Sequence, residues 1–131
     1  MPPGALFLIL AALLGASGVA LGAFGAHGLR NHLAPSALDI WQTAVLYQLL
    51  HALALLVAGL WLRLGTGQAN QGALLTAGWS FTAGMLLFSG SLYALALGGP
   101  RLLGPLTPVG GVALIAGWLA VLWAAVRTAN P

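Results

Sequence analysis

The sequence predicts an all-α integral membrane protein, folded as one domain over residues 1–131 in an antiparallel four-helix bundle. Hydrophobic residues make up 60% of the 131 residues and charged residues only 4%, whereas a soluble domain carries about 25% charged residues. The formal charges lie at or near the ends of apolar runs. This placement suits a bilayer, because an ionised side chain at mid-depth is costly.

The first span is expected over residues 5–26. An apolar run near the N-terminus can be a cleaved signal peptide, but no Lys or Arg precedes this one, so we interpret it as a retained span. Four of its glycines recur at spacings of three, four and three residues: Gly15, Gly18, Gly22 and Gly25. They share one helical face, and such a face allows the backbone of another helix to approach closely.

The second span, over residues 37–62, has the clearest predicted ends. Ser36 and Asp39 form an S-x-x-D pattern before the apolar run, which predicts Ser36 as the N-cap and Asp39 as its reciprocal partner. Arg63 in the last turn and Gly65 beyond it are typical of a helix C-terminus.

Two tryptophans of the second span predict how it crosses the membrane. Trp41 and Trp61 are twenty residues apart, which is about 30 Å along a helix and matches the hydrocarbon thickness of a bilayer. We expect both indoles to act as anchors at the two interfaces.

The third span is expected over residues 71–97 and the fourth over residues 108–127. Thr107 is the predicted N-cap of the fourth span, and Pro108 its first helical residue. Gly117 belongs to a row of small residues that predicts a closely packed helix face. Short connections make neighbouring spans antiparallel, and a small excess of positive charge beside the termini favours their cytoplasmic location.

The polar side chains inside the spans are the main candidates for function. Tyr47 and His51 stand four residues apart near the middle of the second span, with Gln48 beside them. An ionisable residue at that depth is a functional candidate. The alternative is a neutral histidine that is hydrogen-bonded to a hydroxyl group of the first or third span. Ser89 and Ser91 are two such hydroxyl-bearing residues of the third span.

His27 closes the first span in the run GAFGAHGLR. It is either a functional site or a hydrogen-bonded residue that ties the following loop to a helix. Its depth differs too much from that of His51 for the two to share a metal ion. A site of His27, His32 and Asp39 is an alternative, but Asp39 has the simpler capping role. We therefore expect no metal and no other cofactor.

Charge and composition exclude several classes of function. The four arginines are scattered, so the basic cluster that nucleic-acid binding requires is missing; Arg30 and Arg101 are instead candidate contacts for lipid headgroups. The chain has no cysteine and hence no thiolate chemistry. No serine has the paired base that a nucleophile requires, so we do not expect an enzyme.

Four sequence runs together are similar to one family: GASGVALGAFGAHGL, YQLLHALALL, FSGSLYALAL and LGPLTPVGG. They resemble the YgdD/YwdK-type family of small bacterial membrane proteins of unknown function, which is related to vertebrate transmembrane protein 256. The resemblance covers nearly the whole chain. It implies a four-helix protein of the bacterial inner membrane and implies no activity.

Three hypotheses for function are open at this point. The leading one is a non-enzymatic protein that acts through helix–helix interaction in the lipid bilayer, as a homo-oligomer or as an accessory subunit of a larger membrane complex. The second is a small carrier or channel with a polar path around His51. The third is a binder of a lipid, quinone or other apolar ligand between helices.

Overall fold

The computed structural model describes residues 1–65 and 68–130. Four long α-helices and one short 3-10 helix make up most of this part of the chain: α1 (Pro3–His27), α2 (Pro35–Leu64), α3 (Gln68–Ala96), η1 (Arg101–Leu103) and α4 (Leu106–Ala129). Each of the four α-helical elements is long and apolar enough to cross a membrane. The predicted all-α membrane architecture is therefore confirmed.

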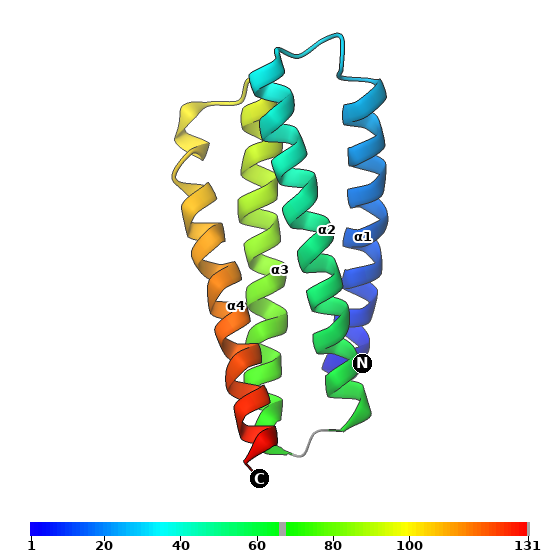
Figure 1. Cartoon of the computed structure of the whole chain (residues 1–131), viewed down its shortest axis with the longest axis vertical. Coiled ribbons are helices and arrows are strands. Elements are labelled where there is room, and N and C mark those ends of the chain that lie inside the picture. Colours follow the sequence, from blue (N-terminus) through cyan, green and yellow to red (C-terminus); the bar gives the residue numbers. More distant parts are fainter. Residues whose placement is uncertain (66–67, 131) are drawn as a thin grey trace.

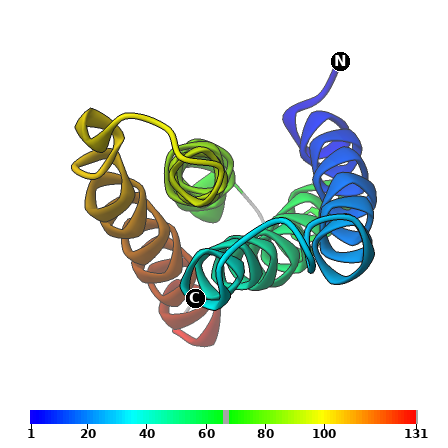
Figure 2. The same cartoon turned by 90° about the horizontal axis from the view of Figure 1, so that it is seen from above.

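Neighbouring helices run antiparallel, and both termini lie at the same end of the molecule (Figure 1). Each helix packs mainly against the next one in the sequence, α1 on α2, α2 on α3 and α3 on α4. Seen from above, α1 and α4 stand on opposite sides of the α2–α3 pair (Figure 2). The antiparallel bundle is confirmed, but its helices form an open row that does not close into a ring.

The N-terminus of α2 differs from the predicted capping box. The helix begins at Pro35, Ala34 is the N-cap residue, and no side chain caps the first turn. Ser36 and Asp39 are helical and exposed. The prediction of a Ser36 cap was wrong because Pro35 itself starts the helix: its ring holds φ near the helical value, and it has no N–H group to satisfy.

The helix α4 also begins earlier than predicted. Its N-cap residue is Pro105, so Thr107 is not the cap and Pro108 is not the first helical residue. The backbone is already nearly helical at Gly104, with φ −54° and ψ −46°. The chain therefore enters α4 without the extended residue that a hydroxyl N-cap requires.

The C-terminus of α2 agrees with the prediction. Arg63 lies in its last turn, and Gly65 follows the helix. Gly65 has a φ of 78°, in the left-handed region that glycine adopts without a steric penalty. A residue with a side chain would be strained at this point, so the glycine marks where α2 ends.

Trp41 does not act as an interfacial anchor. Its side chain is only 3% exposed, and its Nε1 donates a hydrogen bond to the backbone oxygen of Leu21 on α1 at 2.9 Å. Its ring centroid lies 4.7 Å from that of Tyr93 on α3. An anchor must face the headgroup region, so this prediction was wrong: the indole finds its partner inside the bundle.

The glycine-rich face of α1 packs against α2 over most of its length. Gly18, Gly22 and Gly25 lie directly against side chains of α2, and a Cβ atom added at Gly18 would come within 2.7 Å of Leu49. Gly15 differs, because nothing lies within 4 Å of the place that its Cβ atom would take. It faces a groove between α1 and α2 instead of a packed neighbour.

Two glycines of α4 bring it close to α3. A Cβ atom at Gly117 would come within 2.6 Å of the Phe81 ring, and one at Gly110 would lie 2.8 Å from the Cα atom of Phe88. The second contact is with backbone, which a rotamer change cannot relieve. These glycines hold α4 against α3 in one register, as is common between membrane helices.

Gly110→Ala should push α4 away from α3 and lower the free energy of unfolding by about 1–3 kcal/mol, the usual cost of overpacking. Gly111→Ala is the matched control, because a Cβ atom there would meet the Phe88 ring at an ordinary 3.7 Å. Denaturation by dodecyl sulfate in mixed micelles, followed by circular dichroism, measures both variants. Equal destabilisation by the two substitutions would contradict this account of the α3–α4 contact.

Candidate functional site

Gln48 is the centre of a hydrogen-bond network that joins α1, α2 and α3. Its Nε2 atom donates to the backbone oxygen of Leu14 at 2.8 Å and to the hydroxyl of Ser17 at 2.9 Å. Its Oε1 atom accepts a hydrogen bond from the hydroxyl of Tyr93 at 2.7 Å. The side chain is 5% exposed, and these bonds offset the cost of burying a polar amide.

The two candidate serines of α3 make further contacts between helices. The Ser89 hydroxyl donates to the backbone oxygen of Ala44 on α2 at 2.7 Å. The Ser91 hydroxyl lies 2.6 Å from that of Thr107 on α4. Both serines are buried, so the geometry assigns them to helix–helix contact.

His51 connects α2 to α4. Its Nδ1 atom lies 2.8 Å from the backbone oxygen of Tyr47, one turn earlier in α2. Its Nε2 atom accepts a hydrogen bond from Nε1 of Trp118 on α4 at 3.0 Å. A carbonyl oxygen can only accept and an indole N–H can only donate. The imidazole is therefore neutral, with its proton on Nδ1.

Aromatic rings surround this histidine, which is 6% exposed. The ring of Tyr47 stacks on it with centroids 5.9 Å apart, and the rings of Phe81 and Trp118 approach it at 5.7 and 6.0 Å. His51 lies about 24 Å from the start of α2 and about 20 Å from its end. The imidazole is therefore near the middle of the membrane, enclosed by rings.

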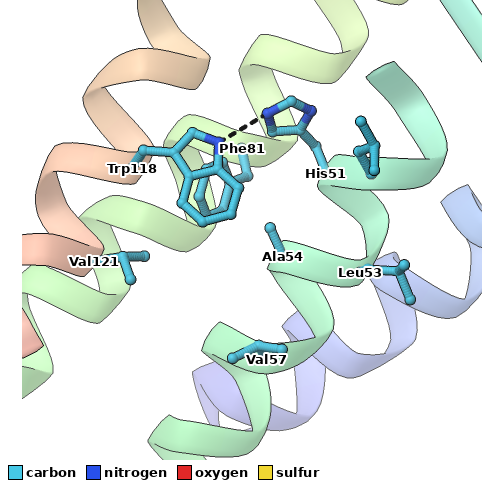
Figure 3. A pocket seen from close by; sticks show the side chains of 8 residues that line it. His51, Leu53, Ala54, Val57, Phe81, Trp118 and Val121 are labelled. Carbon is cyan, nitrogen blue, oxygen red and sulfur yellow. Dashed lines mark hydrogen bonds between the residues drawn. The ribbon is translucent and has the colours of Figure 1, made fainter. Parts of the chain in front are cut away.

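A groove lies between α2 and α4 beside the His51–Trp118 hydrogen bond, with Phe81 of α3 behind the indole (Figure 3). We call it the α2–α4 groove. Its volume is about 460 Å³. Its lining residues are Leu50, His51, Leu53, Ala54, Val57, Phe81, Trp118 and Val121. Leu50, Leu53 and Val57 are exposed, so the groove opens sideways toward the lipid.

The His51–Trp118 pair also borders a second hollow, of about 350 Å³, between the same two helices. Tyr47, Gly111 and Ile115 are among the residues that line it. His51 and Trp118 line both hollows, so their hydrogen bond lies between them. This arrangement makes the pair the best candidate for a binding determinant.

The groove between α1 and α2 has a different character. It is slightly larger, about 530 Å³, and its lining residues, Gly15 and Ala52 among them, are all apolar or glycine. Small-molecule sites combine an apolar lining with a few polar groups that orient the ligand. The α2–α4 groove meets this description, whereas the α1–α2 groove offers no side-chain donor or acceptor.

Comparison with known proteins places the chain in a family. A family model described as "Protein of unknown function (DUF423)" matches residues 21–111, more than half of the chain. The chain belongs to this family. Its match confirms the expected kinship with small bacterial membrane proteins, while the relation to vertebrate transmembrane protein 256 stays a prediction. No solved structure matches the chain.

Relatives of the family match along nearly the whole chain. The "UPF0382 membrane protein YwdK" of Bacillus subtilis is 44% identical over 121 residues, which are 92% of this chain and 96% of the relative. A "UPF0382 membrane protein" of Staphylococcus epidermidis is 46% identical over 124 residues, 95% of this chain and 98% of the relative. With four membrane-spanning helices among its described residues, the chain is an integral membrane protein of this family.

The remaining candidates lie away from the α2–α4 groove. His27 ends α1 and is exposed, and Arg30 and Arg101 are exposed at the same end of the bundle, where headgroups would lie. Tyr47 is partly exposed and belongs to the second hollow beside His51. His51 is hydrogen-bonded inside the bundle, as one of the two interpretations expected, but its partner is the Trp118 indole of α4 and not a hydroxyl group of α1 or α3.

The polar residues of α2 do not line one continuous path. The Thr43 hydroxyl donates to the backbone oxygen of Asp39 in its own helix. Gln48 turns toward α1 and Tyr93, whereas His51 turns toward α4. This division between two sides of α2 weighs against a carrier or channel with a polar path around His51.

No three His, Cys, Asp or Glu side chains of the described residues lie close enough together to hold a metal ion. His27, His32 and Asp39, which were considered together from the sequence, are each exposed. The polar chemistry of the site is therefore that of neutral hydrogen-bond donors and acceptors.

Trp118 is a residue of the site that the sequence did not single out. A tryptophan is readily counted with the apolar residues, but this one lies near the middle of α4, between Leu106 and Ala129. An indole N–H at that depth needs a partner inside the protein. The position of Trp118 near the middle of its span is therefore the signal by which the sequence could have identified it.

Gln48→Leu should lower the free energy of unfolding by about 1–2 kcal/mol, because hydrogen bonds inside membranes contribute about 0.6 kcal/mol each on average. Gln42→Leu is the control on the same helix, since Gln42 is exposed and its replacement should change stability by less than about 0.5 kcal/mol. A double-mutant cycle with Tyr93→Phe isolates the contact between α2 and α3. Strict additivity in that cycle would refute the hydrogen bond between Gln48 and Tyr93.

Proposed function

We propose that this membrane protein binds the apolar chain of a lipid in the α2–α4 groove and catalyses no reaction on it. The observation that supports the proposal is the His51–Trp118 pair, set in the wall of a groove whose other lining residues are hydrocarbon or phenyl side chains. An apolar hollow with a small number of placed polar groups is the usual form of a ligand site.

The size and surroundings of the groove favour a lipid chain as its occupant. Its volume of about 460 Å³ falls within the range of about 300–1,000 Å³ that is common for small-molecule sites. The exposed rim at Leu50, Leu53 and Val57 opens onto the bilayer. The chains of the surrounding lipids are therefore the molecules that meet the groove at highest concentration.

The way in which α4 is attached leaves room for such a chain. Gly110 and Gly117 hold α4 closely against α3, while the Trp118–His51 bond is the one side-chain hydrogen bond between α4 and α2 among the described residues. A chain can enter between α2 and α4 without disturbing the α3–α4 contact. The buried core of Phe7, Leu55, Met85 and their neighbours also stays intact.

Ala54→Phe tests the proposal because it places a ring inside the α2–α4 groove. The protein is reconstituted with a phosphatidylcholine analogue that carries a photoreactive diazirine on one acyl chain, and the labelled peptides are mapped by mass spectrometry. We expect labels on the groove-lining parts of α2 and α4. Their yield should fall about tenfold in Ala54→Phe, as for a loss of 1.4 kcal/mol in binding.

Ala12→Phe is the matched control, since it adds the same ring to the α1–α2 groove. It should leave the labelling of the α2–α4 groove unchanged. Labels spread evenly over all exposed helix faces, or an equal loss in both variants, would show that the groove holds no particular lipid.

Association of two copies through α1 is a second candidate function. The α1–α2 groove is lined by Ala12, Gly15 and Val19 on α1, and nothing lies within 4 Å of the Cβ position of Gly15. Small residues on a lipid-facing surface allow a second membrane helix to approach closely. This observation supports the leading hypothesis from the sequence, in which the protein acts through helix–helix interaction.

Disulfide trapping tests this association directly, because the chain contains no cysteine. Ala12→Cys should form a covalent dimer in native membranes under mild oxidation, since a disulfide requires Cα atoms within about 7 Å of each other. Leu86→Cys is the control, because Leu86 is exposed on the lipid-facing side of α3. Comparable dimer yields from both variants would indicate random collision and refute the interface.

A further inference from the structure

We infer that the α2–α4 groove selects lipids that carry a hydroxyl group on an apolar chain, and that this hydroxyl inserts between Trp118 and His51. The inference rests on the proposed function, because it presumes that a chain occupies the groove. The ligand would be an alcohol, recognised by Nε2 of His51 and Nε1 of Trp118.

His51 and Trp118 each offer one hydrogen-bonding atom to the groove, an acceptor and a donor. The His51 Nδ1 proton is engaged by the backbone oxygen of Tyr47 at 2.8 Å, so the ring presents Nε2 to the groove as an acceptor. Trp118 presents only its Nε1–H donor. At present the two satisfy each other at 3.0 Å.

A hydroxyl group can replace this direct bond without leaving either side chain unsatisfied. Its oxygen accepts the hydrogen bond from Trp118, and its proton is donated to Nε2 of His51. One N–H···N bond is exchanged for two bonds, and no charge is created or buried. The exchange is therefore compatible with a site near the middle of the membrane.

Other polar groups do not fit the same pair. A ketone, ester or ether oxygen can accept a hydrogen bond from Trp118, but it has no proton to donate to His51. The Nε2 atom of His51 would then be a buried acceptor without a donor, which costs its full desolvation penalty. An aliphatic amine has a pKa of about 10, so it is protonated at neutral pH and must lose its proton before it can bridge the pair inside the membrane. A carboxylate or ammonium group would bring an uncompensated charge to mid-depth. The hydroxyl is uncharged at neutral pH, and its oxygen both accepts and donates a hydrogen bond.

The structure also shows which side chain would move. Trp118 is 50% exposed on the rim of the groove, whereas His51 is 6% exposed and also packs against the rings of Tyr47 and Phe81. The indole lies edge-on to Phe81 at 5.2 Å, and space on both sides of it is open. A rotation of Trp118 toward the lipid makes room for the hydroxyl, while His51 keeps its place.

Three matched probes test the inference in phosphatidylcholine nanodiscs: hexadecanol, hexadecyl methyl ether and hexadecane. Each competes with the diazirine lipid for labelling of the α2–α4 groove. Hexadecanol should compete about fivefold more strongly than the ether, because one hydrogen bond distinguishes them at Nε2 of His51. In a ¹⁵N spectrum the Trp118 indole signal, assigned by its loss in Trp118→Phe, should shift with hexadecanol and not with hexadecane.

Two variants separate the contributions of the pair. In His51→Phe the preference for the alcohol over the ether should fall to about one, since both oxygens can still accept from Trp118. In Trp118→Phe that preference should persist, because the hydroxyl proton can still be donated to Nε2 of His51. Circular dichroism confirms that each variant is folded.

The outcomes distinguish this inference from the proposal on which it rests. Groove labelling with equal competition by all three probes, or an alcohol preference that survives His51→Phe, would overturn hydroxyl recognition and leave chain binding in place. Absence of labelling in the α2–α4 groove would overturn both.

Discussion

Polar groups inside a bilayer must find their hydrogen-bond partners within the protein, because the hydrocarbon offers none. The arrangement of this bundle depends on that requirement. Gln48 joins α2 to α1 and α3, Ser89 joins α3 to α2, and Trp118 joins α4 to His51. Membrane helices gain little from apolar burial, since lipid chains are equally apolar. Hydrogen bonds and close glycine contacts therefore decide which helix faces meet.

These contacts are distributed unevenly, and the open shape of the bundle follows from their distribution. The contact of α1 with α2 includes three glycines and two hydrogen bonds donated by Gln48. The contact of α3 with α4 is close at Gly110 and Gly117. Between α2 and α4, by contrast, the described residues provide one side-chain hydrogen bond, that of Trp118 with His51. The molecule is therefore closely packed along the row of helices and hollow beside it, which is where we propose that a lipid chain binds.

Much of the fold can be predicted from the sequence, because bilayer thickness restricts the length of each apolar run and short connections make the spans antiparallel. The errors have identifiable physical causes. Ser36 was predicted as the N-cap of a helix that begins at residue 37, but the helix begins two residues earlier, at Pro35. Trp41 was expected to face the membrane interface but is buried against α1 and α3, because spacing along the sequence does not say which side of a helix faces lipid. The polar character of Gln48 and His51 was visible in the sequence, whereas their partners Tyr93 and Trp118 lie 45 and 67 residues away.

Two roles would explain why the neutral pair of His51 and Trp118 lies near the middle of the membrane. The pair could fix the register of α4, or it could recognise a ligand. The register of α4 is already set by its contact with α3, because the Phe88 backbone and the Phe81 ring leave no room for a Cβ atom at Gly110 and Gly117. Two well-packed apolar side chains at positions 51 and 118 would join α2 and α4 without burying any polar atom. The pair instead places one donor and one acceptor between two hollows. Its arrangement is better explained by a third group that exchanges with the direct bond than by the bond alone.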